Sequence, residues 1–192
     1  MISRPCFGRS STSVACPDSE PSEFFRAQQR LLLEAGRLGP VLDLACGRGR
    51  HSLAAARLGL AVLALDRDET VLRAIQRTDT PLVQCVRTDL EAGYDLPVAP
   101  ASCGAILVFR FLFRPLARAI VEALRPGGLL LYETFTTHQR DLGQGPGNPA
   151  FLLDPNELPK LFGALQPIAY QELFTEGPRP AALARLAARR RS

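Results

Sequence analysis

The chain has 192 residues, of which 46% are hydrophobic and 22% charged, and its formal net charge is +4. This length and composition are typical of one globular domain with a sizeable core. No run approaches the ~18 consecutive apolar residues that a membrane-spanning helix needs, and residues 1–20 lack the apolar stretch of a secretory signal. The sequence therefore predicts neither a membrane partner nor secretion.

The cysteines indicate the redox compartment. Of the five, Cys46, Cys85 and Cys103 lie in or beside apolar runs, which predicts buried free thiols and hence a reducing cytoplasm. Cys6 and Cys16 do not form a C-x-x-C pair, so no metal site is expected.

The whole sequence divides into two predicted parts. Residues 1–20 are rich in Ser, Pro and Cys and are predicted to be poorly ordered, whereas residues 21–192 are predicted to form a single domain. The domain opens with a predicted helix from Pro21 to Ala35, for which Ser22 is a suitable N-cap and Gly36 a stop signal.

The segment VLDLACGRGR, residues 41–50, is the most informative stretch. Its apolar run from Val41 to Ala45 predicts a buried parallel strand, which Gly47 and Gly49 end before a helix-compatible stretch from Ser52 to Leu58. A strand, a glycine-rich turn and a helix present backbone N–H groups and the positive end of a helix dipole at one edge of a sheet. This arrangement suits a nucleotide-like cofactor.

Two acidic residues strengthen that interpretation. Asp43 lies inside the strand, where a carboxylate can face an ammonium group. Asp66 ends the next apolar run, roughly the ~20 residues downstream at which a ribose-binding acid is expected. The alternative is that Asp43 is a paired strand residue and Asp66 an ordinary helix N-cap.

Strand and helix patterns then alternate along the chain. Alternation at this spacing predicts right-handed parallel crossovers and an open sheet covered on both faces, with the binding crevice at the carboxyl ends of the strands. Asp43, Gly47, Asp66 and Asp89 all fall on that edge. The predicted segments are strands 61–65, 82–88, 103–109 and 129–133, helices 68–77 and 115–124, and a loop 91–100.

The run from Asp43 to Gly49 resembles motif I of the class I S-adenosylmethionine-dependent methyltransferases. The resemblance implies that Asp43 and the glycine turn hold the methionine part of S-adenosylmethionine, that Asp66 holds the ribose, and that Asp89 lies beside the adenine amino group. Pro126-Gly127-Gly128 matches the turn before the fifth strand of the family. One departure is Arg50, which stands at the third glycine of the motif. The cofactor-binding residues implied are Asp43, Ala45, Cys46, Gly47, Gly49, Asp66, Arg67, Asp89, Leu90 and Phe109.

The resemblance also implies the fold class. It is an α/β, Rossmann-like, doubly wound and mostly parallel seven-stranded sheet with an antiparallel last strand and helices on both faces. Helix propensity favours a helix over the alanine-rich residues 181–189, whereas the resemblance implies two antiparallel strands over 168–175 and 181–189. The two antiparallel strands are the preferred prediction. Before them, residues 154–157 read as a capping box with proline at the first helical position, opening a helix that ends at Phe162.

Three further residues are candidate substrate contacts. Arg110 and Arg114 follow the fourth predicted strand, where a guanidinium can bind an anion or, alternatively, pair with a nearby carboxylate. His138, in the polar stretch after the fifth strand, is either a base or a loop histidine without a role. His51 is expected to be structural or to lie near the carboxylate of the cofactor. The glycine- and proline-rich residues 143–149 suit a substrate lid.

The function follows from the same resemblance. Stretches around residues 110–116, 132–135 and 147–153 look like the small branch that includes tellurite-resistance methyltransferases, which implies a small-molecule acceptor: an oxyanion such as tellurite or selenite, a thiol or a hydroxyl. The alternatives are an RNA methyltransferase that uses the basic residues 185–191, and a non-catalytic cofactor-binding protein. Nucleic acid is not the expected partner, because a solvated terminus explains the arginines and no aromatic residues lie among them. No catalytic residue and no oligomeric state are predicted.

Overall fold

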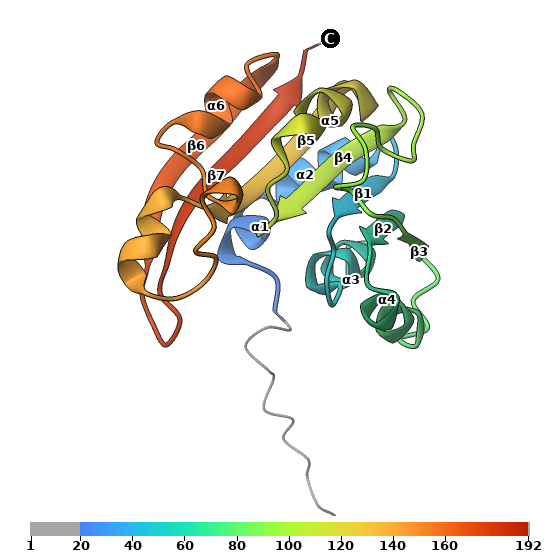
Figure 1. Ribbon diagram of the computed structural model, residues 1–192. Coiled ribbons are helices and arrows are strands. Elements are labelled where there is room, and N and C mark those ends of the chain that lie inside the picture. Colours follow the sequence, from blue (N-terminus) through green and yellow to red (C-terminus); the bar gives the residue numbers. More distant parts are fainter. Residues whose placement is uncertain (1–19, 192) are drawn as a thin grey trace, which may run out of the picture.

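The computed structural model describes residues 20–191, so the predicted disorder of residues 1–20 lies almost entirely outside it. Its seven-stranded sheet has the order β3-β2-β1-β4-β5-β7-β6 (Figure 1). The strands are β1 Val41–Leu44, β2 Val62–Asp66, β3 Val83–Arg87, β4 Cys103–Phe109, β5 Leu124–Phe135, β6 Leu165–Thr175 and β7 Ala181–Arg190. The helices are α1 Glu23–Ala27, α2 Gln29–Gly36, α3 Arg50–Arg57, α4 Glu69–Gln76, α5 Ala117–Ala123 and α6 Glu157–Leu161, with 3₁₀ turns η1 Arg114–Leu116, η2 Thr137–Leu142 and η3 Pro149–Phe151.

The first half of the sheet is parallel, as predicted. β1 pairs in parallel with β2 and β4, β2 with β3, and β4 with β5. The helices α5 and α6 pack on one face of the sheet, and α2 and α3 pack on the other. Every residue of β1 and β4 is consequently buried. The strand order reverses between β1 and β4, which is where open α/β sheets bind ligands, beyond the carboxyl ends of the strands.

The predicted leading helix is divided in two. The break falls at Gln28, between α1 and α2, and Gly36 is the last residue of α2 rather than a stop beyond it. Ser22 is the N-cap, since its side chain accepts a hydrogen bond from the Phe25 N–H at 3.1 Å. The break lets Phe25 reach the edge of the sheet near Phe109, while α2 packs farther along the same face.

The last two strands, β6 and β7, are long and antiparallel. The family resemblance predicted these strands, whereas helix propensity favoured a helix over residues 181–189. β7 is inserted between β5 and β6 and pairs antiparallel with both. Residues 181–188 are all buried, and small alanines fit between the layers above and below the sheet. Pairing on two sides thus overrides the intrinsic helix propensity of alanine.

Several local boundaries differ from the predictions. The fifth strand is longer than residues 129–133, and the helix predicted over 115–124 consists of η1 followed by α5. α6 begins at Glu157 rather than Pro155, because Asn156 adopts a left-handed conformation with φ 58°. Only half of the predicted capping box forms, with the Asp154 N–H donating to Glu157 Oε2 at 2.8 Å.

The cysteines follow the prediction in part. Cys46 and Cys103 are buried free thiols, whereas Cys85 is only half-buried, because β3 is an edge strand. Cys6 and Cys16 lie outside the described residues. Within residues 20–191 no helix is both long and apolar enough to cross a membrane.

Candidate cofactor site

The glycine turn between β1 and α3 is fixed by its backbone conformation. Gly47 and Gly49 have φ values of 53° and 74°, in the left-handed region that favours glycine. Gly49 precedes α3 as its N-cap, and a Cβ atom there would lie 2.6 Å from Cδ1 of Ile75. This position therefore requires glycine for two reasons. Gly49 shapes the turn but lines neither of the two cavities described below, whereas Gly47 lines the second of them.

Asp66, at the end of β2, connects the glycine turn to the next crossover. Its carboxylate accepts hydrogen bonds from the Gly47 N–H at 2.8 Å and from the Asp68 N–H at 2.9 Å. The N-cap of α4 is Asp68, whose side chain accepts from the Thr70 N–H, so Asp66 is not the helix cap that the alternative proposed. A carboxylate offers about four lone-pair positions, which leaves acceptors available for two hydroxyl groups.

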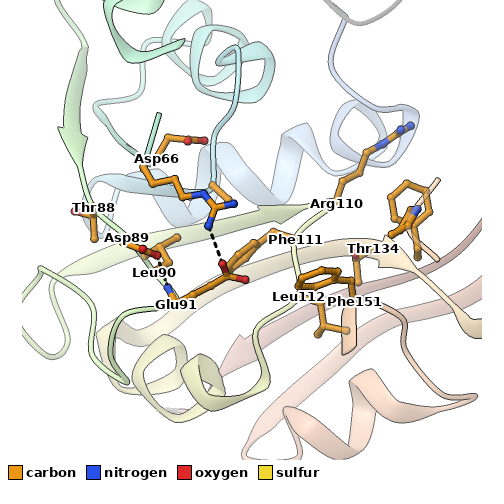
Figure 2. Close-up of a pocket in the computed structure, with 14 residues that line it drawn as sticks. Asp66, Thr88, Asp89, Leu90, Glu91, Arg110, Phe111, Leu112, Thr134 and Phe151 are labelled. Carbon is orange, nitrogen blue, oxygen red and sulfur yellow. Dashed lines mark hydrogen bonds and ion pairs between the residues drawn. The ribbon is translucent and has the colours of Figure 1, made fainter. Parts of the chain in front are cut away.

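A cavity of about 410 Å³ opens beside Asp66 at the carboxyl ends of the strands (Figure 2). Asp89 also lines it, and its carboxylate accepts from the Glu91 N–H at 3.0 Å. Arg67 and Glu91 form an ion pair of 3.0 Å at its rim. The predicted residues lining this cavity are Ala45, Asp66, Arg67, Asp89, Leu90 and Arg110.

Eight further residues line this cavity that were not among the predicted site residues. Thr88 and Glu91 lie one and two positions from Asp89 in the sequence, and this closeness could have identified them as site residues. The others come from the segment after β4, the end of β5 and the segment after β5, within the stretches that the sequence marked by the family resemblance or as a substrate lid. The eight are Thr88, Glu91, Phe111, Leu112, Thr134, Phe135, Pro146 and Phe151.

A second cavity, of about 380 Å³, lies around the glycine turn. Ala45 and Arg110 line both cavities, so the two meet at these residues. An elongated ligand can therefore lie across the edge of the sheet with its middle at this junction. The second cavity is lined by Asp43, Ala45, Cys46, Gly47, Arg48, Arg50, His51, Phe109 and Arg110.

Asp43 is the buried acid of the second cavity. Only 1% of it is exposed, and one carboxylate oxygen accepts from the Ser52 hydroxyl at 2.5 Å. Burial raises the pKa of Asp43 to about 7, although the hydrogen bond from Ser52 acts in the opposite direction. A cationic group beside Asp43 would favour its ionised form, which is the role that an ammonium group would fulfil.

His51 holds α1 against the site. Its Nε2 atom accepts a hydrogen bond from the Ser22 N–H at 3.2 Å, and its ring stacks on Phe109 with a centroid distance of 3.8 Å. Burial lowers the pKa of His51 to about 2, so the ring is neutral. His51 thus has the structural role that the sequence suggested, and it also lines the second cavity.

Arg110 and Arg114 have different surroundings. Arg110, at the end of β4, has the left-handed φ of 58° and places its guanidinium carbon 5.4 Å from the ring centre of Phe135. Arg114 lines neither cavity and is paired with Glu157 at 2.5 Å. The hypothesis that Arg114 faces substrate is therefore replaced by the alternative, pairing with a carboxylate.

His138 does not lie at the site. It is exposed, its ring meets Phe174 edge-on at 5.9 Å, and it lines neither cavity. A base at His138 is therefore not supported by the lining of either cavity.

Taken together, the doubly wound sheet and the paired cavities define an α/β protein that binds a nucleotide-like cofactor at its topological switch point. Residues 41–128 match the family model described as a methyltransferase domain. No curated protein sequence matches the chain.

Several solved structures have the same fold as this chain. TehB from Haemophilus influenzae is 21% identical with a TM-score of 0.67, and the match covers 85% of this chain but only 62% of TehB. A protein that takes part in the conversion of a disulfide bond into a thioacetal group during echinomycin biosynthesis is 20% identical with a TM-score of 0.67, over 90% of this chain and 82% of that one. A SAM-dependent methyltransferase from Aquifex aeolicus is 16% identical with a TM-score of 0.63, over 89% and 94% of the two chains. The family model thus identifies residues 41–128 as a methyltransferase domain, and the solved structures show that the chain has the fold of S-adenosylmethionine-dependent methyltransferases.

Proposed function

We propose that the protein transfers the methyl group of S-adenosylmethionine to a small-molecule acceptor. The observation that supports this most strongly is the meeting of the two cavities at Ala45 and Arg110. The adenosyl part of the cofactor would occupy the cavity that Asp66 and Asp89 line, and the methionine part would occupy the cavity that Asp43 lines. The sulfonium, which joins these parts, would then lie at the junction.

The chemistry asks little of the protein. The sulfonium methyl group is already electrophilic, so alignment of an acceptor lone pair opposite the leaving sulfur provides most of the catalysis. A small acceptor suits the available space, because the first cavity has a volume of about 410 Å³ and would also hold the adenosyl part of the cofactor. The free thiols among the described residues favour a reducing compartment such as the cytoplasm.

Two findings argue against a nucleic-acid substrate held by the C-terminal arginines. Residues up to Arg190 belong to β7 and do not form a solvated tail. Arg185 pairs with Glu133 at 2.7 Å and Arg189 with Glu34 at 2.8 Å, while Arg190 donates to backbone carbonyls. These guanidinium groups are already engaged within the chain, which makes them poor phosphate ligands.

Calorimetric titration and a radiolabel assay test the proposal. The full chain should bind S-adenosylmethionine and S-adenosylhomocysteine but not NADH, and should transfer a tritiated methyl group to a member of a panel of small anions, thiols and phenols. Binding of NADH without S-adenosylhomocysteine would refute the cofactor assignment. Cofactor binding without transfer to any of the panel or to RNA would favour the non-catalytic alternative.

A further inference from the structure

The cavity beside Asp66 has two chemically different ends (Figure 2). Asp66, Asp89 and Glu91 make one end acidic, which suits the hydroxyl and amino groups of an adenosyl moiety. The other end is apolar and aromatic. Its walls are Phe111 and Leu112 from the segment after β4, Phe135 from β5, and Pro146 and Phe151 from the segment after β5. An acceptor that enters beside the cofactor meets these side chains.

Among the described residues, the aromatic end of the cavity is formed by side chains other than carboxylates and histidines. Besides its apolar walls, only Thr134 and Arg110 contribute polar side chains to it. Two nearby titratable groups are engaged elsewhere: Tyr132 donates its hydroxyl hydrogen to the Phe111 carbonyl at 3.0 Å, and Glu133 is paired with Arg185. The acceptor must therefore bring a lone pair that needs no general base from the protein.

Arg110 supplies a positive charge where the two cavities meet. The sulfonium of the cofactor would bring a second positive charge to the same place, so a negatively charged acceptor is favoured electrostatically there. An anion that attacks a sulfonium yields two neutral products. Such a reaction is accelerated in apolar surroundings, because these favour the loss of both charges.

The aromatic wall is held in place before any ligand binds. The Arg114 guanidinium donates to the carbonyls of Ala150 and Leu152 at 2.9 and 2.8 Å, on either side of Phe151, and also to Glu157. Phe151 is 42% exposed and lines the cavity. A preformed apolar surface of this kind selects an acceptor with an apolar body.

We propose that the acceptor is an apolar organic thiol, which binds against Phe111, Phe135 and Phe151 and reacts as its thiolate beside Arg110. This inference rests on the proposed methyl-transfer function. The thiol loses its proton to solvent, and the thiolate sulfur then forms a bond to the methyl carbon as the bond from that carbon to the sulfonium sulfur breaks. The electron pair of that bond passes to the departing sulfur, so the products are a methyl thioether and S-adenosylhomocysteine.

The other acceptors suit these surroundings less well. A hydroxyl needs a base, which the aromatic end does not provide. Tellurite and selenite are strongly hydrated oxyanions, and the apolar side chains that form most of this end of the cavity offer their oxygens no hydrogen bonds. A carboxylate needs no base, but its charge is spread over two hydrated oxygens, whereas a thiolate is a softer and less strongly hydrated nucleophile.

Matched acceptors test the inference with the full chain and tritiated S-adenosylmethionine. We expect methylation of benzyl mercaptan with a kcat/KM at least about tenfold above that of 2-mercaptoethanol, because the apolar body is removed from water. Benzyl alcohol, phenylacetate and tellurite should not be methylated. Equal or better use of 2-mercaptoethanol, phenylacetate or tellurite overturns the inference, and so does the absence of thiol methylation by protein that binds S-adenosylhomocysteine. Failure to bind that cofactor product instead rejects the proposed function.

Two variants test the residues. Phe151→Ala should raise the KM for benzyl mercaptan about tenfold and leave both the KM for 2-mercaptoethanol and the affinity for S-adenosylhomocysteine unchanged. Arg110→Gln should move the pH dependence of kcat for benzyl mercaptan to higher pH, because a cation no longer favours the thiolate form of the bound thiol. Arg118→Gln, on the exposed face of α5, is the control and should behave as the native chain. A pH profile that Arg110→Gln leaves unmoved contradicts the assignment.

Discussion

The Ser52 hydroxyl donates a 2.5 Å hydrogen bond to the carboxylate of Asp43, and both residues are almost completely buried. This contact joins the first turn of α3 to the middle of β1, directly behind the glycine turn. Burial of the charge outweighs the hydrogen bonds from Ser52 and the nearby charge of Arg50, so the pKa of Asp43 is raised to about 7. The acid is thus easily protonated until a cation arrives beside it.

Cofactor affinity should consequently depend on pH through Asp43. The ammonium group of S-adenosylmethionine favours ionised Asp43, so the Kd should rise by up to about tenfold per pH unit as the pH falls below 7. Asp43→Asn should bind the cofactor weakly and lose this dependence. Calorimetry from pH 5.5 to 8 would show it, and an equal pH dependence in the variant would contradict the role of Asp43.

Asp43 and His51 should influence folding stability in opposite directions. The pKa of Asp43 is raised in the folded state, so its contribution to the free energy of unfolding decreases as the pH rises from about 4 to 7. The pKa of His51 is lowered, so its contribution is full above about 6.5 and decreases as the pH falls below that value. Between pH 4 and 6.5 the two slopes oppose each other, each at up to about 1.4 kcal/mol per pH unit.

Urea unfolding at pH 4.5, 5.5 and 6.5 separates the two contributions. Relative to the native chain, Asp43→Asn should become more stable as the pH rises over this range, and His51→Gln should become less stable. If both variants follow the native pH dependence, neither pKa shift exists in the folded protein.

Asp66 is expected to contribute to cofactor binding in two ways. Asp66→Ala removes the acceptors for the ribose hydroxyls and also frees the Gly47 N–H, which the carboxylate holds at 2.8 Å. The loss of charged hydrogen bonds should weaken S-adenosylmethionine binding by ~1.5–3 kcal/mol. Asp79→Asn, an exposed residue after α4, serves as the control and should bind normally. An unchanged affinity in Asp66→Ala would reject its ribose role.

The ion pair of Glu133 and Arg185 should be important for stability. Its side chains are 2% and 10% exposed, and the Arg185 Nε atom lies 2.7 Å from Glu133 Oε2. Glu133→Gln leaves the buried Arg185 cation without its close carboxylate partner, with the exposed Glu23 3.9 Å away, and should lower the free energy of unfolding by about 3–5 kcal/mol. Replacing both residues, as Glu133→Leu with Arg185→Met, should restore much of that loss, because neither partner is then left charged. Denaturant unfolding decides between these outcomes.

Arg114 should affect the acceptor but not the cofactor. Arg114→Gln releases the carbonyls on both sides of Phe151, so the KM for an apolar acceptor should rise about five- to tenfold, the equivalent of one or two lost hydrogen bonds. The affinity for S-adenosylhomocysteine should stay constant, and cleavage by trypsin near Lys160 should become faster. A parallel loss of cofactor affinity would show that Arg114 supports the whole site.

Much of the fold was predictable because its first half is made of local patterns. The apolar runs that became β1, β2 and β4 are long enough to require burial, and they end before Gly47, at Asp66 and before Arg110, respectively. Parallel strands bring their carboxyl ends to one edge, so the placement of Asp43, Asp66 and Asp89 around adjoining cavities follows from the order of the segments. The roles assigned to these residues remain predictions.

The sequence by itself determined the parallel sheet, the glycine turn and the edge at which a cofactor binds, because periodicity and turn residues act over a few neighbouring positions. The tertiary structure shows why the alanine-rich end forms β7, as the resemblance predicted and local propensity did not, because pairing with β5 and β6 outweighs that propensity. It also decided that Arg114 pairs with Glu157 and that Phe111, Phe135 and Phe151 share one cavity. Such contacts join residues far apart in the chain, and no local pattern records them.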